Sequence, residues 1–252
     1  MKLVKASYEI LEPNLDWRGD CSKPSDVIYK QIERAGRTCY KSEDKITNES
    51  AEKFVRSCVK RGHEAMLEHA SMTVKFICDR GISHEIVRHR IASYAQESTR
   101  YCNYSQDKFG NEITVIEPSF FFDIPEGRRA AIRDYLDVII KCIDISELND
   151  HERAYGIWYF SCKRVETDYF DLLNCGLTAQ EARDILPTSL KTEIIVTMNM
   201  REWRHFLKLR AAGTTGKPHP QMQEIAVPLL KELREKLPAL FDDIPLPEEN
   251  AV

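Results

Sequence analysis

Two strand-like runs, each followed by a helix, constrain the fold of this chain more than any other feature. Residues 69–78 (HASMTVKFIC) place apolar side chains at a period of two, and residues 191–200 (KTEIIVTMNM) are the most strand-like run of the second half. The second run passes directly into residues 201–210 (REWRHFLKLR), which have helical spacing and should bury Trp203 and Phe206. The first run is expected to lead, after Gly81, into a helix that ends in Arg88-His89-Arg90. Both strand-to-helix connections therefore carry a cluster of arginine and histidine.

The remaining elements mix helix and strand. Further strands are expected at 2–11 and 112–116, and helices are expected from Pro24, over 47–61, across most of 126–162, from 178 to 186 and over 221–236. This order predicts an α+β protein with a mostly antiparallel central sheet flanked by helices and a long helical segment. Residues 1–242 are expected to form a single domain, and residues 243–252 a loose C-terminal tail.

Composition narrows the possible functions. The 252 residues are 42% hydrophobic and 30% charged, which is typical of a soluble globular protein, and the net charge of −4 disfavours general nucleic-acid binding. Neither a signal peptide nor an apolar run near the ~20 residues of a membrane span is present, which predicts a cytoplasmic protein without membrane contact. The eight cysteines include no C-x-x-C pair and are expected to be free thiols.

Residues 84–101 (HEIVRHRIASYAQESTRY) concentrate arginine beside apolar side chains. Arginine forks suit phosphate and carboxylate oxygens, so this stretch suggests a site for a small anionic ligand. A basic helix face in water would give the same spacing. His84 and His89 are five residues apart rather than the four of a zinc-peptidase helix, so no metal site is predicted.

Four motifs in the chain match one family. Residues 88–100 (RHRIASYAQESTR) resemble the R-H-R-x-x-S-x-x-x-x-S-x-R signature of the flavin-dependent thymidylate synthases. The stretch from Gly62 to His69 is similar to the family's G-H-E-x-x-x-E-H, the residues around Arg183 to its A-R-x-x-L-P, and Asn199 to Arg210 to its N-x-R…L-R segment. The four matches occur in the family's order along nearly the whole chain.

The resemblance implies a reductive methylation of dUMP to dTMP. Methylenetetrahydrofolate would supply the carbon, FADH2 the hydride, and NADPH would re-reduce the FAD. The family uses no cysteine nucleophile, and this chain lacks the Pro-Cys-His motif of classical thymidylate synthases. Uracil activation would then be electrostatic, by a fixed cation in a dry site. The family role gives Arg210 as that catalytic cation, and the resemblance further implies a homotetramer with each active site assembled from several subunits.

The resemblance also implies two sets of binding residues. The set expected to bind dUMP is Glu85, Arg88, Gln96, Ser98, Arg100, Arg183 and Arg210. The set expected to bind FAD is His63, Arg88, His89, Arg90, Gln96, Asn199, Arg201 and His205. Ser98 is interpreted as a binding residue because no general base stands beside it in the sequence.

Alternatives remain for single residues and for the whole chain. His63 could cap the preceding helix, Arg183 could pair with an acid on its own helix, and Arg201 could pair with Glu202 or a distant acid. Two other functions are a non-catalytic nucleotide- or RNA-binding module and a flavin reductase that never methylates. Ala65 stands where the family commonly has threonine, and the loop 211–224 departs from the family pattern.

Overall fold

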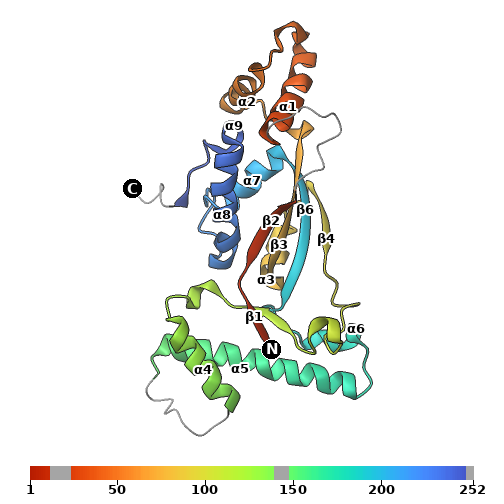
Figure 1. Cartoon of the computed structure of the whole chain (residues 1–252), viewed down its shortest axis with the longest axis vertical. Helices are drawn as coiled ribbons and strands as arrows, with labels where there is room; N and C mark the ends of the chain where they lie inside the picture. The colour runs from red at the N-terminus through yellow and green to blue at the C-terminus, as the bar shows by residue number, and fades with distance from the viewer. Residues whose placement is uncertain (12–23, 139–147, 248–252) are drawn as a thin grey trace. The chain divides into compact units, whose positions relative to one another are not determined.

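The computed structural model describes residues 1–11, 24–138 and 148–247. The chain divides into two compact units, and each is described by itself (Figure 1). Unit 1 comprises Met1–Ala6, Ile77–His84 and Gln96–Glu193, and unit 2 comprises Ser7–Phe76, Glu85–Ala95 and Ile194–Val252. Within the described residues, no helix combines the length and the apolar character that crossing a membrane requires.

The central sheet has four strands. They are, in order across the sheet, β2 (Ser7–Leu11), β3 (Ser71–Asp79), β6 (Lys191–Asn199) and β4 (Ala92–Gln96). Alternate residues of β3 and β6 are buried, as their sequences predict, and a 2.9 Å hydrogen bond joins the hydroxyls of Thr73 and Thr197. The strands run antiparallel, so the predicted α+β class with a mostly antiparallel central sheet is confirmed.

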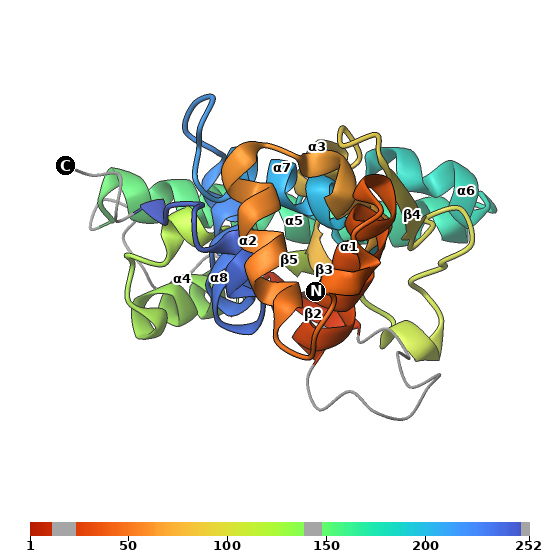
Figure 2. The same ribbon diagram turned by 90° about the horizontal axis from the view of Figure 1, so that it is seen from above.

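Unit 2 contains several helices. They are α1 (Pro24–Tyr40), α2 (Ser50–Arg61), α7 (Met200–Arg210), α8 (Pro220–Lys236) and α9 (Pro238–Phe241), with the short 3-10 helices η1 (Glu43–Lys45) and η2 (Glu64–His69). Of these, α7 and α8 contact the sheet. Helices α1 and α2 lie side by side (Figure 2). Their approach requires Gly36, because a Cβ atom there would lie 2.3 Å from Cζ of Phe54. Helix α2 stops where predicted, at Gly62, whose φ of 70° is left-handed.

An aromatic cluster fixes α7 on β3. Trp203 and Phe206 of α7 and Phe76 of β3 are fully buried, with ring centroids 5.6 to 6.3 Å apart. The Trp203 indole donates to the carbonyl of Met72 at 3.0 Å, so its polar atom is also satisfied. The predicted burial of Trp203 and Phe206 is confirmed, and this packing holds the far end of α7, which is Arg210, in place.

Unit 1 contains a small parallel sheet and a long helix. Strand β1 (Lys2–Val4) pairs with β5 (Thr114–Ile116), with Leu3 opposite Val115. The helices are α4 (Glu126–Val138), α5 (Asp150–Asn174) and α6 (Ala179–Ala182), with η3 (Asp107–Phe109), η4 (Ser119–Phe121) and η6 (Arg183–Ile185). Helix α5 begins with a capping box between Asn149 and Glu152, and its inner face buries Tyr155 and Tyr169.

Several element boundaries differ from the sequence prediction, and α5 continues to Asn174 where the helical stretch was expected to end near residue 162. Residues 2–11 form two strands in different sheets rather than one. The helix from Thr178 has the expected capping box, but α6 has only four residues before it tightens into η6. The helix expected to end at Arg88 to Arg90 is α3 (Arg80–Ile86), which ends earlier. After Ile86 the backbone tightens into a turn in which the Ile86 carbonyl accepts from the amide of His89 at 3.1 Å, and the Tyr94 hydroxyl contacts the carbonyls of both residues.

Residues 84–101 are therefore not a basic helix face. They contain the end of α3, a turn through Arg88 and strand β4, followed by a second turn at Ser98 to Tyr101. In this turn Arg88 and Arg90 are exposed, whereas His89 between them is buried. The cations of this stretch are thus placed individually.

The described cysteines are free thiols, as expected. Cys58, Cys78 and Cys162 are buried, whereas Cys39 and Cys175 are exposed. Two further cysteines, at positions 21 and 142, lie outside the described residues.

The beginning of the segment expected to be a loose tail packs against unit 2. The carboxylate of Asp243 pairs with the buried Arg204 guanidinium at 2.7 Å, and Ile244 is fully buried.

Candidate functional site

Arg210, the last residue of α7, is held from two directions within unit 2. Its Nη1 donates to the Glu85 carboxylate at 2.7 Å and its Nη2 to the Glu85 backbone carbonyl at 3.2 Å. Its Nε donates to Nε2 of His89 at 3.3 Å. A guanidinium has about five N–H groups, so one on each Nη remains for a ligand. The Arg210 side chain is 22% exposed, which makes it a fixed and partly desolvated cation.

His89 and Glu202 form a buried pair behind Arg210. Nδ1 of His89 lies 3.0 Å from the Glu202 carboxylate, and the two residues are 5% and 7% exposed. Burial lowers the pKa of His89 below its ordinary value, the Glu202 carboxylate opposes that shift, and the charge of Arg210 adds to it. His89 is consequently a neutral imidazole at neutral pH.

His89, Glu202 and His205 bring three ligand-type atoms within 4.8 Å of one another. The environment disfavours a metal ion all the same. Nδ1 of His89 is committed to Glu202, and its Nε2 already faces the Arg210 cation at 3.3 Å. A divalent cation would have to displace a hydrogen bond and sit beside a positive charge, so the absence of a metal site stays our prediction.

Arg88 and Arg90 flank the buried His89, and both are exposed. In the part of the chain that the structure describes, neither guanidinium forms a hydrogen bond or an ion pair. His205 is also exposed, with its ring edge-on to that of His89 at a centroid distance of 5.5 Å. Two uncompensated cations on one short turn, with the exposed imidazole of His205 on α7 next to the His89 ring, are a donor set suited to an anionic ligand.

Of three other residues expected to contact FAD, Asn199 and Arg201 have side-chain partners, whereas His63 does not in the described part of the chain. The Asn199 side chain caps α7 by accepting from the amide of Glu202 at 2.9 Å. Arg201 pairs with Glu68 at 2.6 Å, so a distant acid, and not Glu202, is its partner. His63 caps α2 only through its backbone amide, which leaves its exposed ring available.

Unit 1 gathers the remaining predicted residues around the turn at Ser98. Nε of Arg100 donates to the Gln180 side chain at 2.8 Å, and Nη1 of Arg183 reaches the Thr99 hydroxyl at 3.4 Å. The Ser98 hydroxyl accepts from the amide of Arg100 at 3.3 Å, which fits a role in shaping the turn rather than a nucleophile. The short α6 and η6 thus bring Arg183 to the segment that carries Ser98 and Arg100.

Gln96, at the end of β4, is oriented within unit 1 by two hydroxyls. Its amide donates to Ser83 at 2.9 Å and to Thr192 at 3.2 Å. Ser83 is fully buried and Thr192 nearly so, which gives the Gln96 side chain one fixed direction.

Sequence reasoning missed Glu202 and Gln180. Glu202 stands three residues after the cap Asn199, where a glutamate usually signals a capping box. Its carboxylate instead turns to His89, a contact between residues 113 positions apart that no local pattern encodes. Gln180 is on the helix before Arg183, and its contact with Arg100 likewise depends on the tertiary fold.

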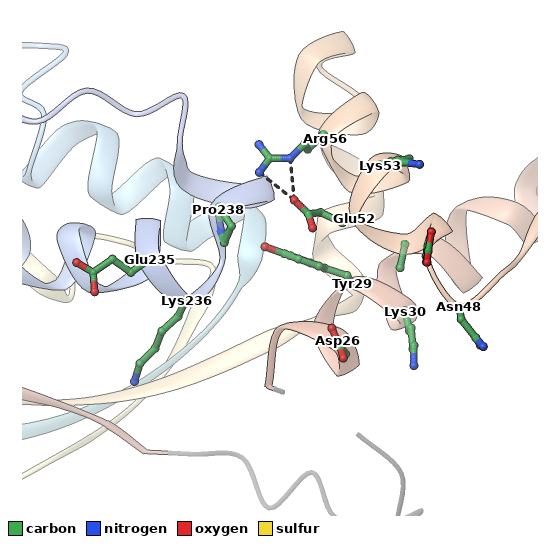
Figure 3. A pocket seen from close by; sticks show the side chains of 12 residues that line it. Asp26, Tyr29, Lys30, Asn48, Glu52, Lys53, Arg56, Glu235, Lys236 and Pro238 are labelled. Carbon is green, nitrogen blue, oxygen red and sulfur yellow. Dashed lines mark hydrogen bonds and ion pairs between the residues drawn. The ribbon is translucent and has the colours of Figure 1, made fainter. Parts of the chain in front are cut away.

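A separate pocket of about 580 Å³ lies elsewhere in unit 2, between α1, the start of α2 and the end of α8 (Figure 3). None of the predicted dUMP or FAD residues lines it. Its acidic and basic side chains balance, and Arg56 already pairs with Glu52 at 2.9 Å. The pocket therefore shows no preference for an anion.

The amino-acid sequence of the chain is similar to those of a known family. The family described as "Thymidylate synthase complementing protein" matches residues 27–239. A flavin-dependent thymidylate synthase of Corynebacterium aurimucosum is 31% identical over 96% of this chain and 90% of its own length. The chain belongs to the flavin-dependent thymidylate synthase family. Another member, from Pyrococcus furiosus, is 30% identical over 80% of this chain and 70% of its own.

Solved structures share the fold of this family member. The UMP/dUMP methylase PolB from Streptomyces cacaoi, bound with 5-Br dUMP, superposes with a TM-score of 0.69 at 20% identity and covers 96% of both chains. Thymidylate Synthase X from Helicobacter pylori, with FAD and dUMP, gives a TM-score of 0.61 at 22% identity over 86% of this chain and 93% of its own.

Proposed function

We propose that this protein is a flavin-dependent thymidylate synthase that reductively methylates dUMP to dTMP. Methylenetetrahydrofolate supplies the carbon, FAD in its reduced form supplies the hydride when bound, and NADPH restores the reduced FAD. The observation that carries the proposal is the Arg210 guanidinium, fixed by Glu85 and His89 with two N–H groups remaining, in a chain that belongs to this family.

Arg210 is proposed to activate the uracil ring. C5 of uracil becomes nucleophilic when negative charge on N3 and the ring carbonyl oxygens is stabilised, and a preorganised cation does this without rearranging in the reaction. Arg210 meets that requirement because its anchors hold the guanidinium before any ligand arrives. Glu85 partly neutralises the cation, which keeps it tolerable in a partly desolvated place.

A cysteine nucleophile has little support in the described residues. Burial raises the pKa of the Cys78 thiol to about 12 and of Cys162 to about 11, so both stay protonated at neutral pH. The absence of the Pro-Cys-His motif points the same way. Activation by a cation is therefore the simpler mechanism for this chain.

The binding residues are proposed separately for each unit. In unit 2, Arg88, Arg90, His63, His89 and His205 are proposed to hold FAD, together with Asn199 and Arg201, and Glu85, Arg88 and Arg210 to bind dUMP. In unit 1, Ser98, Arg100 and Arg183 are proposed to bind dUMP, and Gln96 to contact both ligands. The two exposed arginines beside His89 fit the diphosphate of FAD, which needs two cations at short spacing. Arg201 would have to exchange its ion pair with Glu68 for the FAD contact.

The family resemblance also supports a cytoplasmic homotetramer that uses NADPH. In such an assembly each active site is built from residues of several subunits. Analytical ultracentrifugation of the purified protein tests the tetramer directly.

Tritium release from 5-tritiated dUMP tests the reaction. We expect release under anaerobic conditions when FAD, NADPH and methylenetetrahydrofolate are all present, and none when the folate is omitted. A yellow protein that oxidises NADPH without releasing tritium would be a flavin reductase. A colourless protein that binds polyanions in a salt-dependent manner would be a nucleotide- or RNA-binding module.

A further inference from the structure

Glu202 has an unusual position for a helix-start glutamate. It lies at the third position of α7, where its amide is capped by Asn199, yet its carboxylate is not used to complete a capping box. It is buried against His89 instead, with Oε1 3.0 Å from Nδ1. Burying a carboxylate costs free energy of desolvation, and the hydrogen bond to His89 offsets part of that cost.

The contacts on both sides of the His89 imidazole determine which ring nitrogen carries the proton. Arg210 Nε can only donate, because a guanidinium has no acceptor and does not lose its proton. Nε2 of His89, 3.3 Å away, must therefore carry the lone pair, and the proton of the neutral ring is on Nδ1. Nδ1–H then donates to Glu202 at 3.0 Å. In the opposite tautomer the N–H of His89 Nε2 would face the N–H of Arg210 Nε, and the lone pair of Nδ1 would face the Glu202 carboxylate.

We propose that Glu202 is a positioning residue for Arg210. Its carboxylate fixes His89 in the Nδ1–H tautomer, and Nε2 of that tautomer holds Nε of Arg210. This inference rests on the proposed function in one respect, namely that Arg210 acts on the substrate. The Glu202 carboxylate hydrogen-bonds His89 and acts through it.

The contacts from Glu202 through His89 to Arg210, here named the relay, give the guanidinium its second anchor. Glu85 holds the two Nη atoms, and a guanidinium attached only there could still swing about the Glu85 contacts. The Nε contact to His89 removes that freedom. Because a misplacement of about 1 Å can slow a reaction by about a hundredfold, losing the anchor should lower kcat. It should leave dUMP affinity largely intact, because Arg100 and Arg183 are untouched.

The same relay makes Arg210 sensitive to pH. The charged or titratable groups that face His89 are Glu202, Arg210 and His205 from α7, with Glu85 behind Arg210 and the Tyr94 hydroxyl donating to the His89 carbonyl. Protonation of His89 would turn Nε2 into a donor and break its bond to Arg210. Since the Glu202 carboxylate raises the pKa of His89, its removal shifts that protonation to lower pH.

The test compares E202Q with E52Q in the full-length holoenzyme. Both changes remove one carboxylate charge without changing side-chain size, and Glu52 lies on α2 in an exposed pair with Arg56. For E202Q we expect kcat to fall about ten- to hundredfold with the dUMP Kd unchanged, and the acid limb of the kcat profile to move to lower pH. E52Q should keep the wild-type kcat and profile. General structural damage would not lower the rate and at the same time shift the acid limb downwards.

A spectrum of the wild-type protein tests the tautomer without any turnover. With 15N-histidine labelling at pH 8, and His89 assigned by its loss in H89Q, the expected signals are a protonated Nδ1 and an unprotonated Nε2. A protonated Nε2 in the wild type overturns the proposal, even if E202Q fails to fold. Wild-type kcat and pH profile in E202Q overturn it as well. If the wild type shows the expected tautomer but releases no tritium from dUMP, the relay stands and the proposed function falls.

Discussion

Replacing Arg210 by alanine should abolish most turnover and leave the protein folded with its flavin. The change removes a fixed cation and two free N–H donors at the proposed uracil site. Removing a single preorganised donor in comparable sites costs about 3 kcal/mol of transition-state stabilisation, which is about a hundredfold in rate. Because Arg210 contributes both charge and donors, a hundredfold loss of kcat is the minimum we expect.

The cost to stability should be small. The Arg210 and Glu85 side chains are 22% and 34% exposed, so solvent screens the pair and its loss should cost only about 1 kcal/mol. The assay is tritium release with saturating cofactors, accompanied by the flavin absorbance of the same sample and a urea unfolding curve. Arg56→Ala is the matched control, because Arg56 also pairs with acids but lies on α2 away from the proposed site.

Two results would contradict this reasoning. A variant that keeps a turnover within about tenfold of wild type would show that Arg210 is not the activating cation, because the expected loss is at least a hundredfold. A variant that loses its flavin, while Arg56→Ala keeps it, would make Arg210 a FAD-binding residue instead. In that case the loss of activity would say nothing about uracil activation.

Three other changes test separate parts of the structure. Arg183→Ala should raise the Kd for dUMP about tenfold, because one charge-assisted hydrogen bond is lost. Calorimetric titration with dUMP measures this change. Arg204→Ala should lower the free energy of unfolding in urea by about 2 kcal/mol without affecting dUMP binding, because it leaves Asp243 and the Leu240 carbonyl without their buried partner. Lowering the pH should destabilise the wild-type fold. Below pH 6.5 His89 binds a proton in the unfolded chain but not in the folded protein, where burial lowers its pKa. The free energy of unfolding should therefore fall by up to about 1.4 kcal/mol per pH unit until the pH reaches the pKa of His89 in the folded protein.

Elements with strong periodicity were predictable from the sequence. Strands β3 and β6 and helix α7 lie within a residue or two of the prediction, because burial of one face is encoded in the alternation of side chains. The end of α3 was not predictable in this way. The helix gives way to a turn whose carbonyls, those of Ile86 and His89, are contacted by the Tyr94 hydroxyl, and such a contact from outside the helix leaves no local periodicity.

The candidate site shows the same division. Arg88, Arg183 and Arg210 were singled out because their motifs resemble a family, and motif order survives in sequence. The specific pairings around the site could not be predicted, and for Arg201 the sequence offered only Glu202 or an unnamed distant acid. The Glu202 to His89 contact joins residues 113 positions apart, and Arg201 pairs with Glu68 across 133 positions. The motifs identified which residues belong to the candidate site, whereas the contacts between those residues became evident only from the three-dimensional structure.

The end of α3 and the placement of Arg210 are one structural event. At the end of α3 the carbonyls of Glu85 and Ile86 accept from the turn amides of Arg88 and His89. A second acceptor position on each carbonyl is used by a side chain, Nη2 of Arg210 on Glu85 and the Tyr94 hydroxyl on Ile86. The turn that follows presents Nε2 of His89 to the same guanidinium. Arg210 therefore helps to satisfy the backbone of the segment that orients it. That mutual arrangement explains how two arginine-rich segments more than a hundred residues apart can produce one fixed cation, and it makes the cation's direction a property of the fold and not of a flexible side chain.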